Sequence, residues 1–119
     1  MKRKTIRNHK DFCMPKNGLR VSMGDFIVKA ISTRKPDDPR YGLVVSKRNF
    51  KFAVQRNRAK RLMRDWIMAN EHLMLPDLDY VFIIYNSVLE CDRKKGRRKV
   101  KRALVKITKM YNQNEKKPA

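Results

Sequence analysis

The stretch Lys47–Ile67, which reads KRNFKFAVQRNRAKRLMRDWI, decides how the rest of the chain is interpreted. From Lys47 to Arg64 it contains eight Lys or Arg residues and no acid. At about 100° per residue, one side of a helix would carry a polar set made up of Asn57, Lys60, Arg61 and Arg64. The opposite side would carry an apolar set made up of Ala59, Leu62, Met63 and Trp66. The pattern therefore predicts an amphipathic helix that buries Trp66 and keeps its cations in solvent.

A row of cations on such a rigid helix suits a folded polyanion. Arg can grip one phosphate through two parallel donors, so a fixed row of guanidinium groups can match a fixed row of phosphates. We expect the helix to run from about Val54 to Leu73, because Pro76 stops it.

The overall charge points to the same kind of partner. The chain has 119 residues, with 31 Lys plus Arg against 11 Asp plus Glu, and a formal net charge of +20. The charge is uneven: residues 1–10 hold five bases and no acid, and residues 93–110 hold ten bases and no acid. Clustered charge of this size favours a nucleic-acid partner over a merely solvated basic surface. We expect one domain spanning residues 1–119.

An acidic membrane surface could also attract the basic runs. However, the sequence has no apolar run of about 18 residues that could span a bilayer. The basic residues Lys2–Lys4 are followed by no apolar segment of the kind that signal peptides carry. Cys13 and Cys91 have no metal-site spacing and are interpreted as free thiols. A cytoplasmic location is therefore expected.

The remaining elements are predicted from the local composition and from the Pro, Gly and Asp residues that end helices and strands. Residues 1–18 form a basic arm, mobile over 1–4, and a short helix that Pro15 and Gly18 end. Strands follow at Asp25–Ile31 and Arg40–Ser46, which we expect to pair as a hairpin across a turn rich in Pro and Asp. The nearly continuous apolar run Tyr80–Asn86 predicts a central strand covered on both faces.

A final helix is predicted over Arg93–Tyr111, with a mobile tail at 112–119. Its apolar stripe consists of Val100, Ala103, Leu104, Ile107 and Tyr111. Gly96 predicts a late or frayed start. The element order is α-β-β-α-β-α, so the fold class is α+β, a small mixed sheet with helices.

Alternation within the first strand assigns its two faces. Phe26, Val28 and Ala30 share the face that we assign to the core. Lys29 then faces a groove on the other side, or is an ordinary solvated strand lysine. In the loop before the basic helix, Phe50 and Phe52 alternate with cations, as single-stranded RNA binders often do. Alternatively, Phe50 or Phe52 could plug the edge of the sheet, and we expect that role for Phe52.

The sequence does not predict catalysis by the polypeptide itself. Nucleases need clustered carboxylates for metal ions, or paired histidines for acid–base work. Here Asp37 and Asp38 lie in a turn, and His9 and His72 lie in different elements. We therefore interpret the chain as a binder that has no catalytic residues and no metal ligands of its own.

Several motifs resemble one known family. Arg56-Asn57-Arg58 followed by Lys60-Arg61-Leu62 resembles the signature helix of the protein subunit of bacterial ribonuclease P. The segment Arg40–Arg48 is similar to the strand that precedes that helix. Asp11-Phe12 matches the Asp-Phe pair of the family's first helix, and Asp79-Tyr80-Val81 resembles its third main strand. The resemblance covers nearly the whole chain.

The resemblance implies an α/β sandwich, like a ribosomal-protein domain, with a left-handed crossover. It also implies that a catalytic RNA subunit supplies the active site and holds the Mg²⁺. The protein would bind that RNA, contact the 5′ leader of precursor tRNA, and promote the affinity for substrate and Mg²⁺. The ribonucleoprotein would act as the endonuclease that removes the leader, with no further protein partner required.

The residues that would carry these contacts fall into two sets. Contacts with the RNA subunit are expected from Arg56, Asn57, Arg58, Lys60, Arg61 and Arg64. Contacts with the leader and tRNA are expected from Phe12, Lys29, Lys47, Arg48 and Lys51. Phe12 could equally be a core anchor for the first helix.

The main alternative function is a ribosomal or ribosome-assembly protein that binds rRNA without an enzymatic role. A DNA-binding repressor is a weaker option, since we find no helix-turn-helix pair.

Overall fold

The computed structural model describes residues 4–5, 18–32, 40–45 and 50–116. The predicted first helix lies almost wholly outside these ranges. In chain order, the described elements are β1 (Lys4–Thr5), β2 (Leu19–Ser22), β3 (Phe26–Ser32), β4 (Arg40–Val44), α2 (Ala53–Ala69), the 3₁₀ turn η1 (Glu71–Leu73), β5 (Leu78–Ile84), the 3₁₀ turn η2 (Asn86–Glu90) and α3 (Arg93–Lys116). The α+β class predicted from the sequence is confirmed.

The strands form one mixed sheet with the order β1-β4-β5-β3-β2. β5 is the middle strand, parallel to β4 and antiparallel to β3, which confirms the central position that its apolar run predicted. The predicted hairpin between β3 and β4 is wrong, because β5 lies between them. The hairpin partner of β3 is instead the short strand β2, through a turn in which Gly24 has a φ of 86°.

The parallel pair β4 and β5 is joined through α2. A parallel pair needs a long crossover connection, and here that connection is the basic helix itself. The left-handed sense of this crossover stays an implication of the family resemblance.

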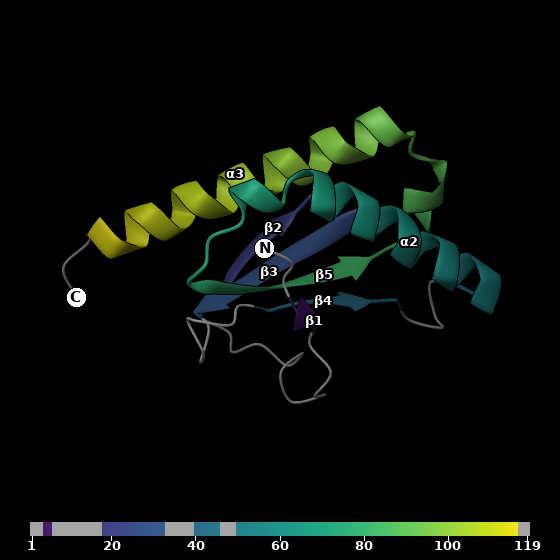
Figure 1. Cartoon of the computed structure of the whole chain (residues 1–119), viewed down its shortest axis with the longest axis horizontal. Helices are drawn as coiled ribbons and strands as arrows, with labels where there is room; N and C mark the ends of the chain where they lie inside the picture. The colour runs from purple at the N-terminus through teal and green to yellow at the C-terminus, as the bar shows by residue number, and fades with distance from the viewer. Residues whose placement is uncertain (1–3, 6–17, 33–39, 46–49, 117–119) are drawn as a thin grey trace.

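α2 and α3 lie side by side over one face of the sheet (Figure 1). Their apolar stripes meet the core face of the strands. The predicted core face of β3 is confirmed, since Phe26, Val28 and Ala30 are all fully buried. The predicted stripes on the helices are also confirmed, with Trp66 only 1 % exposed and Leu104 fully buried. The outward faces of both helices are thereby fixed relative to the sheet.

α3 begins at Arg93, as the predicted bounds have it, and the late or frayed start that Gly96 suggested is wrong. Asp92 caps the helix: its Oδ1 accepts a hydrogen bond from the Lys95 backbone N–H at 2.7 Å. Gly96 is buried within the first turns and does not delay the helix. Its backbone lies directly against the ring of Trp66, so the glycine is explained by packing between the helices.

Three smaller expectations also change. α2 ends at Ala69 and is followed by η1, so the predicted helix to Leu73 is divided in two. α3 extends beyond Tyr111 to Lys116, further than predicted. Phe52 is 63 % exposed, so the role that we expected for it as a plug of the sheet edge is wrong; of the two phenylalanines, Phe50 is the one that is fully buried.

Candidate nucleic-acid interface

The outward face of α2 carries the cations that the sequence pattern placed there. Arg58, Arg61 and Arg64 are exposed, as is Asn57, and Lys60 is half-buried. Asp65, the one acid in the α2 sequence, pairs instead with α3: its Oδ2 lies 3.3 Å from an Arg97 nitrogen and 3.5 Å from Arg93 Nε. The exposed arginines of α2 are therefore not paired with the acid of their own helix.

Arg56 has a partly structural role that the sequence did not reveal. Its side chain is half-buried, and its Nη1 donates a hydrogen bond to the carbonyl of Phe50 at 3.0 Å. This contact holds the chain that enters α2. Arg has five N–H donors, so others remain for a phosphate.

The charge at the start of α2 is unfavourable for an isolated helix. The first turn has no acid, and no side chain caps the N-terminus at Phe52. Cations near a helix N-terminus cost about 0.3–1 kcal/mol each, because they oppose the helix dipole. A bound polyanion would remove that cost. The end of α2 is held by Asn70, whose Nδ2 donates to the carbonyls of Trp66 (2.9 Å) and Arg97 (3.0 Å).

A second group of cations lies on the sheet face that is turned away from the helices. Lys29 is there, because it alternates with the core residues Val28 and Ala30. Directly opposite it on β2 is Arg20, an exposed residue that the sequence analysis missed. Like charges at opposed positions destabilise a sheet, so this pair favours a bound anion. Only the register could have found Arg20, since β2 was not predicted.

The structure describes only some of the other residues that we expect to contact the 5′ leader. Lys51 is exposed, just before α2. Phe12, Lys47 and Arg48 lie outside the described residues. The structure thus places Lys29 beside Arg20 on the sheet and Lys51 at the entrance to α2.

The first turns of α3 are anchored to the β2–β3 turn by a small polar cluster. Lys99 Nζ forms an ion pair with the carboxylate of Asp25, and the Cys91 thiol donates to Asp25 Oδ2 at 3.2 Å. Burial raises the pKa of Asp25, but hydrogen bonds from Lys99, Ser87 and Cys91 outweigh it and leave the pKa below its ordinary value. The carboxylate in turn raises the pKa of Lys99, and burial together with that same carboxylate raises the pKa of the Cys91 thiol.

Within the ranges that the structure describes, no three His, Cys, Asp or Glu side chains are grouped so that they could hold a metal ion. In the same ranges, no helix has the length and apolar character needed to cross a membrane.

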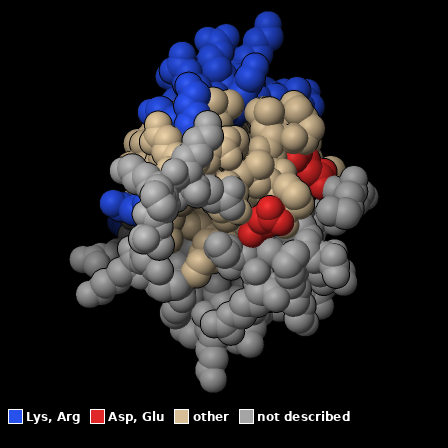
Figure 2. Space-filling model, turned by 90° about the vertical axis from the view of Figure 1, so that its left-hand side faces the viewer, with Lys and Arg blue, Asp and Glu red and all other residues tan. Residues whose placement is uncertain are grey.

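Lys and Arg side chains gather over the part of the molecule where α3 lies (Figure 2). Together with the cationic face of α2, this surface defines a basic α+β domain of the kind that binds nucleic acid. The family model described as Ribonuclease P matches residues 1–108. The chain belongs to the ribonuclease P protein family.

Individual relatives are consistent with that assignment. The chain is 55 % identical over 47 residues to the ribonuclease P protein component of Pseudomonas entomophila (strain L48), a match covering 40 % of this chain and 35 % of that protein. The match therefore spans about a third of the relative's length. The structure of the Staphylococcus aureus RNase P protein superposes with a TM-score of 0.72 at 26 % identity, covering 91 % of this chain and 97 % of that one. For the Thermotoga maritima RNase P protein the TM-score is 0.71 at 25 % identity, covering 86 % and 96 %.

Proposed function

We propose that this chain is the protein subunit of a cytoplasmic ribonuclease P, in which it assists a catalytic RNA during removal of the 5′ leader from precursor tRNA. The observation that carries the proposal is the cationic face of α2. Arg61 and Arg64 are exposed because Trp66 and Met63, on the other side of the same helix, are buried in the core. Membership of the family supports the same reading.

In this proposal α2 binds the RNA subunit. Its contacts come from Arg56, Asn57, Arg58, Lys60, Arg61 and Arg64. Because the helix is packed on the sheet, its backbone loses little conformational freedom on docking, and only the exposed side chains must be ordered. Each phosphate that they neutralise releases counterions, which makes the binding strongly dependent on salt.

The leader of the precursor tRNA binds on the other side of the sheet. Lys29 and Arg20, paired across β3 and β2, provide charge for its phosphates. Phe12, Lys47, Arg48 and Lys51 complete the proposed set. A single-stranded leader suits a site that combines cations with an aromatic ring, since its bases are free to stack.

The protein's part in the reaction is to bind the precursor tRNA and to orient it on the RNA subunit. The Mg²⁺ ions that catalysis needs are held by the RNA subunit, whose phosphate oxygens are the hard ligands that this ion prefers. The chain raises the affinity for substrate and for Mg²⁺ by neutralising nearby backbone charge.

The proposal is tested by adding the purified chain to a bacterial ribonuclease P RNA at low Mg²⁺ concentration. We expect it to stimulate 5′ cleavage of a precursor tRNA, and the double variant Arg61→Ala/Arg64→Ala to stimulate much less. Protein freed of all RNA should not cleave. Cleavage by such protein, or a folded chain that binds ribosomal RNA tightly yet gives no stimulation, would count against the proposal. The second result would favour the ribosomal alternative.

A further inference from the structure

We propose that the outward face of α3 is a second RNA-binding surface, which holds the phosphate backbone of double-stranded RNA. We call it the α3 ridge, and it consists of Arg98, Lys101, Arg102, Val105, Lys106 and Lys109. The inference goes beyond the proposed function, because it uses none of the residues assigned to the RNA subunit or the leader.

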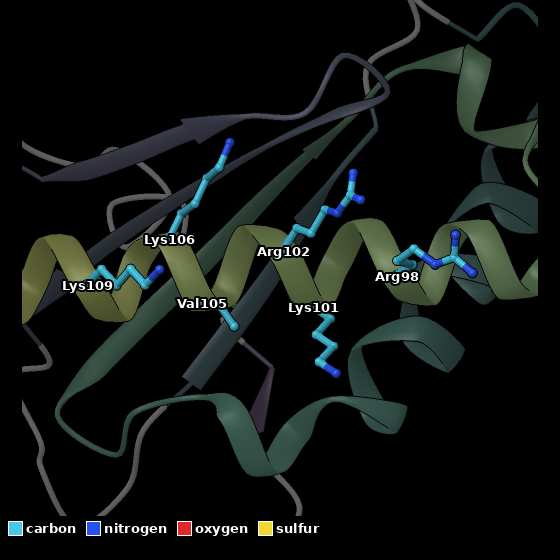
Figure 3. Close-up of a pocket in the computed structure, with 6 residues that line it drawn as sticks. All are labelled: Arg98, Lys101, Arg102, Val105, Lys106 and Lys109. Atoms are coloured by element: carbon cyan, nitrogen blue, oxygen red, sulfur yellow. The ribbon is translucent and has the colours of Figure 1, made fainter.

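The ridge is a regular array. Arg98, Arg102 and Lys106 are spaced by four residues and form one row; Lys101 and Lys109 flank Val105 in another. Each four-residue step advances about 6 Å along the helix, and the whole ridge spans about 16 Å. Figure 3 shows Arg102 and Lys106 extending to one side of α3 and Lys101 to the other. Together the six residues line an open hollow of about 600 Å³.

The cations of the ridge have no acidic partner among the residues that the structure describes. This contrasts with the neighbouring cations on α3: Arg93 and Arg97 pair with Asp65, and Lys99 pairs with Asp25. The sequence from Arg93 to Asn114 contains no acid at all. Like charges four residues apart destabilise a helix, so the ridge lowers the stability of α3 until an anion binds.

The residue types favour duplex RNA over a single strand. Single-stranded RNA is bound through aromatic rings on which its bases stack, and the ridge has none. Its one uncharged member is the aliphatic Val105, and the other five are cations. A surface of this kind contacts the phosphate backbone, which a duplex presents while its bases are paired.

A membrane surface fits the ridge poorly. A helix that lies in a membrane interface inserts an apolar face. The apolar face of α3 is already used in the core, where Val100, Leu104 and Ile107 are fully buried. The α3 ridge therefore offers five cations and, apart from the single side chain of Val105, no apolar surface to insert.

The ridge is also held rigidly. Gly96 against Trp66 and Lys99 with Asp25 fix the first turns of α3, while the buried stripe fixes the rest. Rigid placement of cations reduces the entropy lost on binding.

The test uses the full chain and an RNA duplex of mixed sequence with blunt ends, unrelated to ribonuclease P RNA. Its affinity is measured at several salt concentrations, beside one of its strands alone. The variant Lys101→Gln/Lys106→Gln/Lys109→Gln should bind the duplex about tenfold or more weakly near 0.1 M salt, with a log–log salt slope shallower by roughly two. The charge-conserving variant Lys101→Arg/Lys106→Arg/Lys109→Arg is the matched control and should bind like the wild type.

Three results would overturn the proposal. The first is an unchanged affinity and slope in the glutamine variant, with circular dichroism showing that it is folded. The second is an equal loss of affinity for the single strand, which would mean a non-selective charge effect. The third is tighter binding of poly-glutamate or of phosphatidylglycerol vesicles than of the duplex at the same salt. Cleavage of precursor tRNA is not measured, so these outcomes are independent of the proposed function.

Discussion

A Cβ atom built on Gly96 would lie 2.2 Å from Cε2 and 2.3 Å from Cζ2 of Trp66, so the indole packs directly against the backbone of α3. No side chain can occupy this space unless the ring or the helix moves. This contact therefore limits how far apart α2 and α3 can lie, and with it the relative position of their two cationic faces.

Gly96→Ala should lower the free energy of unfolding by about 1–3 kcal/mol, because it overpacks the contact between the helices. Helix propensity alone would predict the opposite sign, because alanine is more favourable than glycine in a helix by about 1 kcal/mol. A loss of stability would therefore point to the contact with Trp66. Urea unfolding followed by circular dichroism measures the change. In a Trp66→Phe background the smaller ring removes most of the clash, because the outer part of the indole with Cζ2 is absent, so the same substitution should cost less. An equal cost in both backgrounds would show that the indole is not the cause.

The Asp25–Lys99 pair should make stability depend on pH at both ends of the range. The pKa of Asp25 is lowered, so its contribution is complete above the ordinary carboxyl pKa and is lost as the pH falls through the lowered one. The pKa of Lys99 is raised, so its contribution is complete below the ordinary lysine pKa and is lost as the pH rises through the raised one.

Asp25→Asn should reduce the dependence of stability on pH at both the acid and the alkaline end. It should also lower the free energy of unfolding near neutral pH by about 2 kcal/mol. Unfolding in urea at a series of pH values measures this. The Cys91 thiol, whose pKa is also raised, adds to the loss at alkaline pH. Cys91→Ala is therefore the control that separates its contribution from that of Lys99. An Asp25→Asn profile parallel to the wild type would contradict the assignment.

Arg61→Ala and Arg64→Ala should each weaken binding to the RNA subunit. Each should also make the log–log dependence on salt shallower by about 0.7–0.9, because one phosphate contact is lost. Met68→Ala is the matched control: it lies on the same helix and is 57 % exposed, but it carries no charge. Filter binding over a range of salt concentrations gives both numbers. If neither arginine variant differed from Met68→Ala, α2 would not be the docking face.

Lys29→Gln should reduce the preference for leader-bearing over mature tRNA by about fivefold near 0.1 M salt, as expected for one lost phosphate contact. Arg20→Gln, at the opposed position on β2, should have a similar effect. Lys106→Gln is the control on the other side of the molecule, and it should leave the ratio unchanged because both tRNAs share the same duplex regions. The groove assignment fails if the ratio is constant in both sheet variants.

The helical periods allowed much of the fold to be predicted. A stripe such as Val100, Leu104 and Ile107 is local information, and burial follows from it directly. The apolar run of β5 likewise predicted a central strand. The family motif and the period together identified the exposed cations of α2, although Arg56 proved to be partly structural through its bond to Phe50.

The failures concern interactions between distant parts of the chain. Strand pairing was assumed to follow chain order, whereas β5 inserts between β3 and β4. Gly96 was judged by helix propensity, but its reason is Trp66, thirty positions earlier in the chain. Phe50 and Phe52 have the same local environment in sequence, and only the packed structure decides which is buried.

A nascent chain that has not yet emerged as far as Ile84 lacks the strand that joins the two halves of the sheet. Until then, the hairpin of β2 and β3 has no partner on its inner edge, and neither does β4. α2 has already been synthesised by that stage, with its apolar side uncovered. Cooperative folding must therefore wait until β5 has emerged, and the ribosome holds a strongly cationic, unfinished polypeptide close to its own RNA in the meantime.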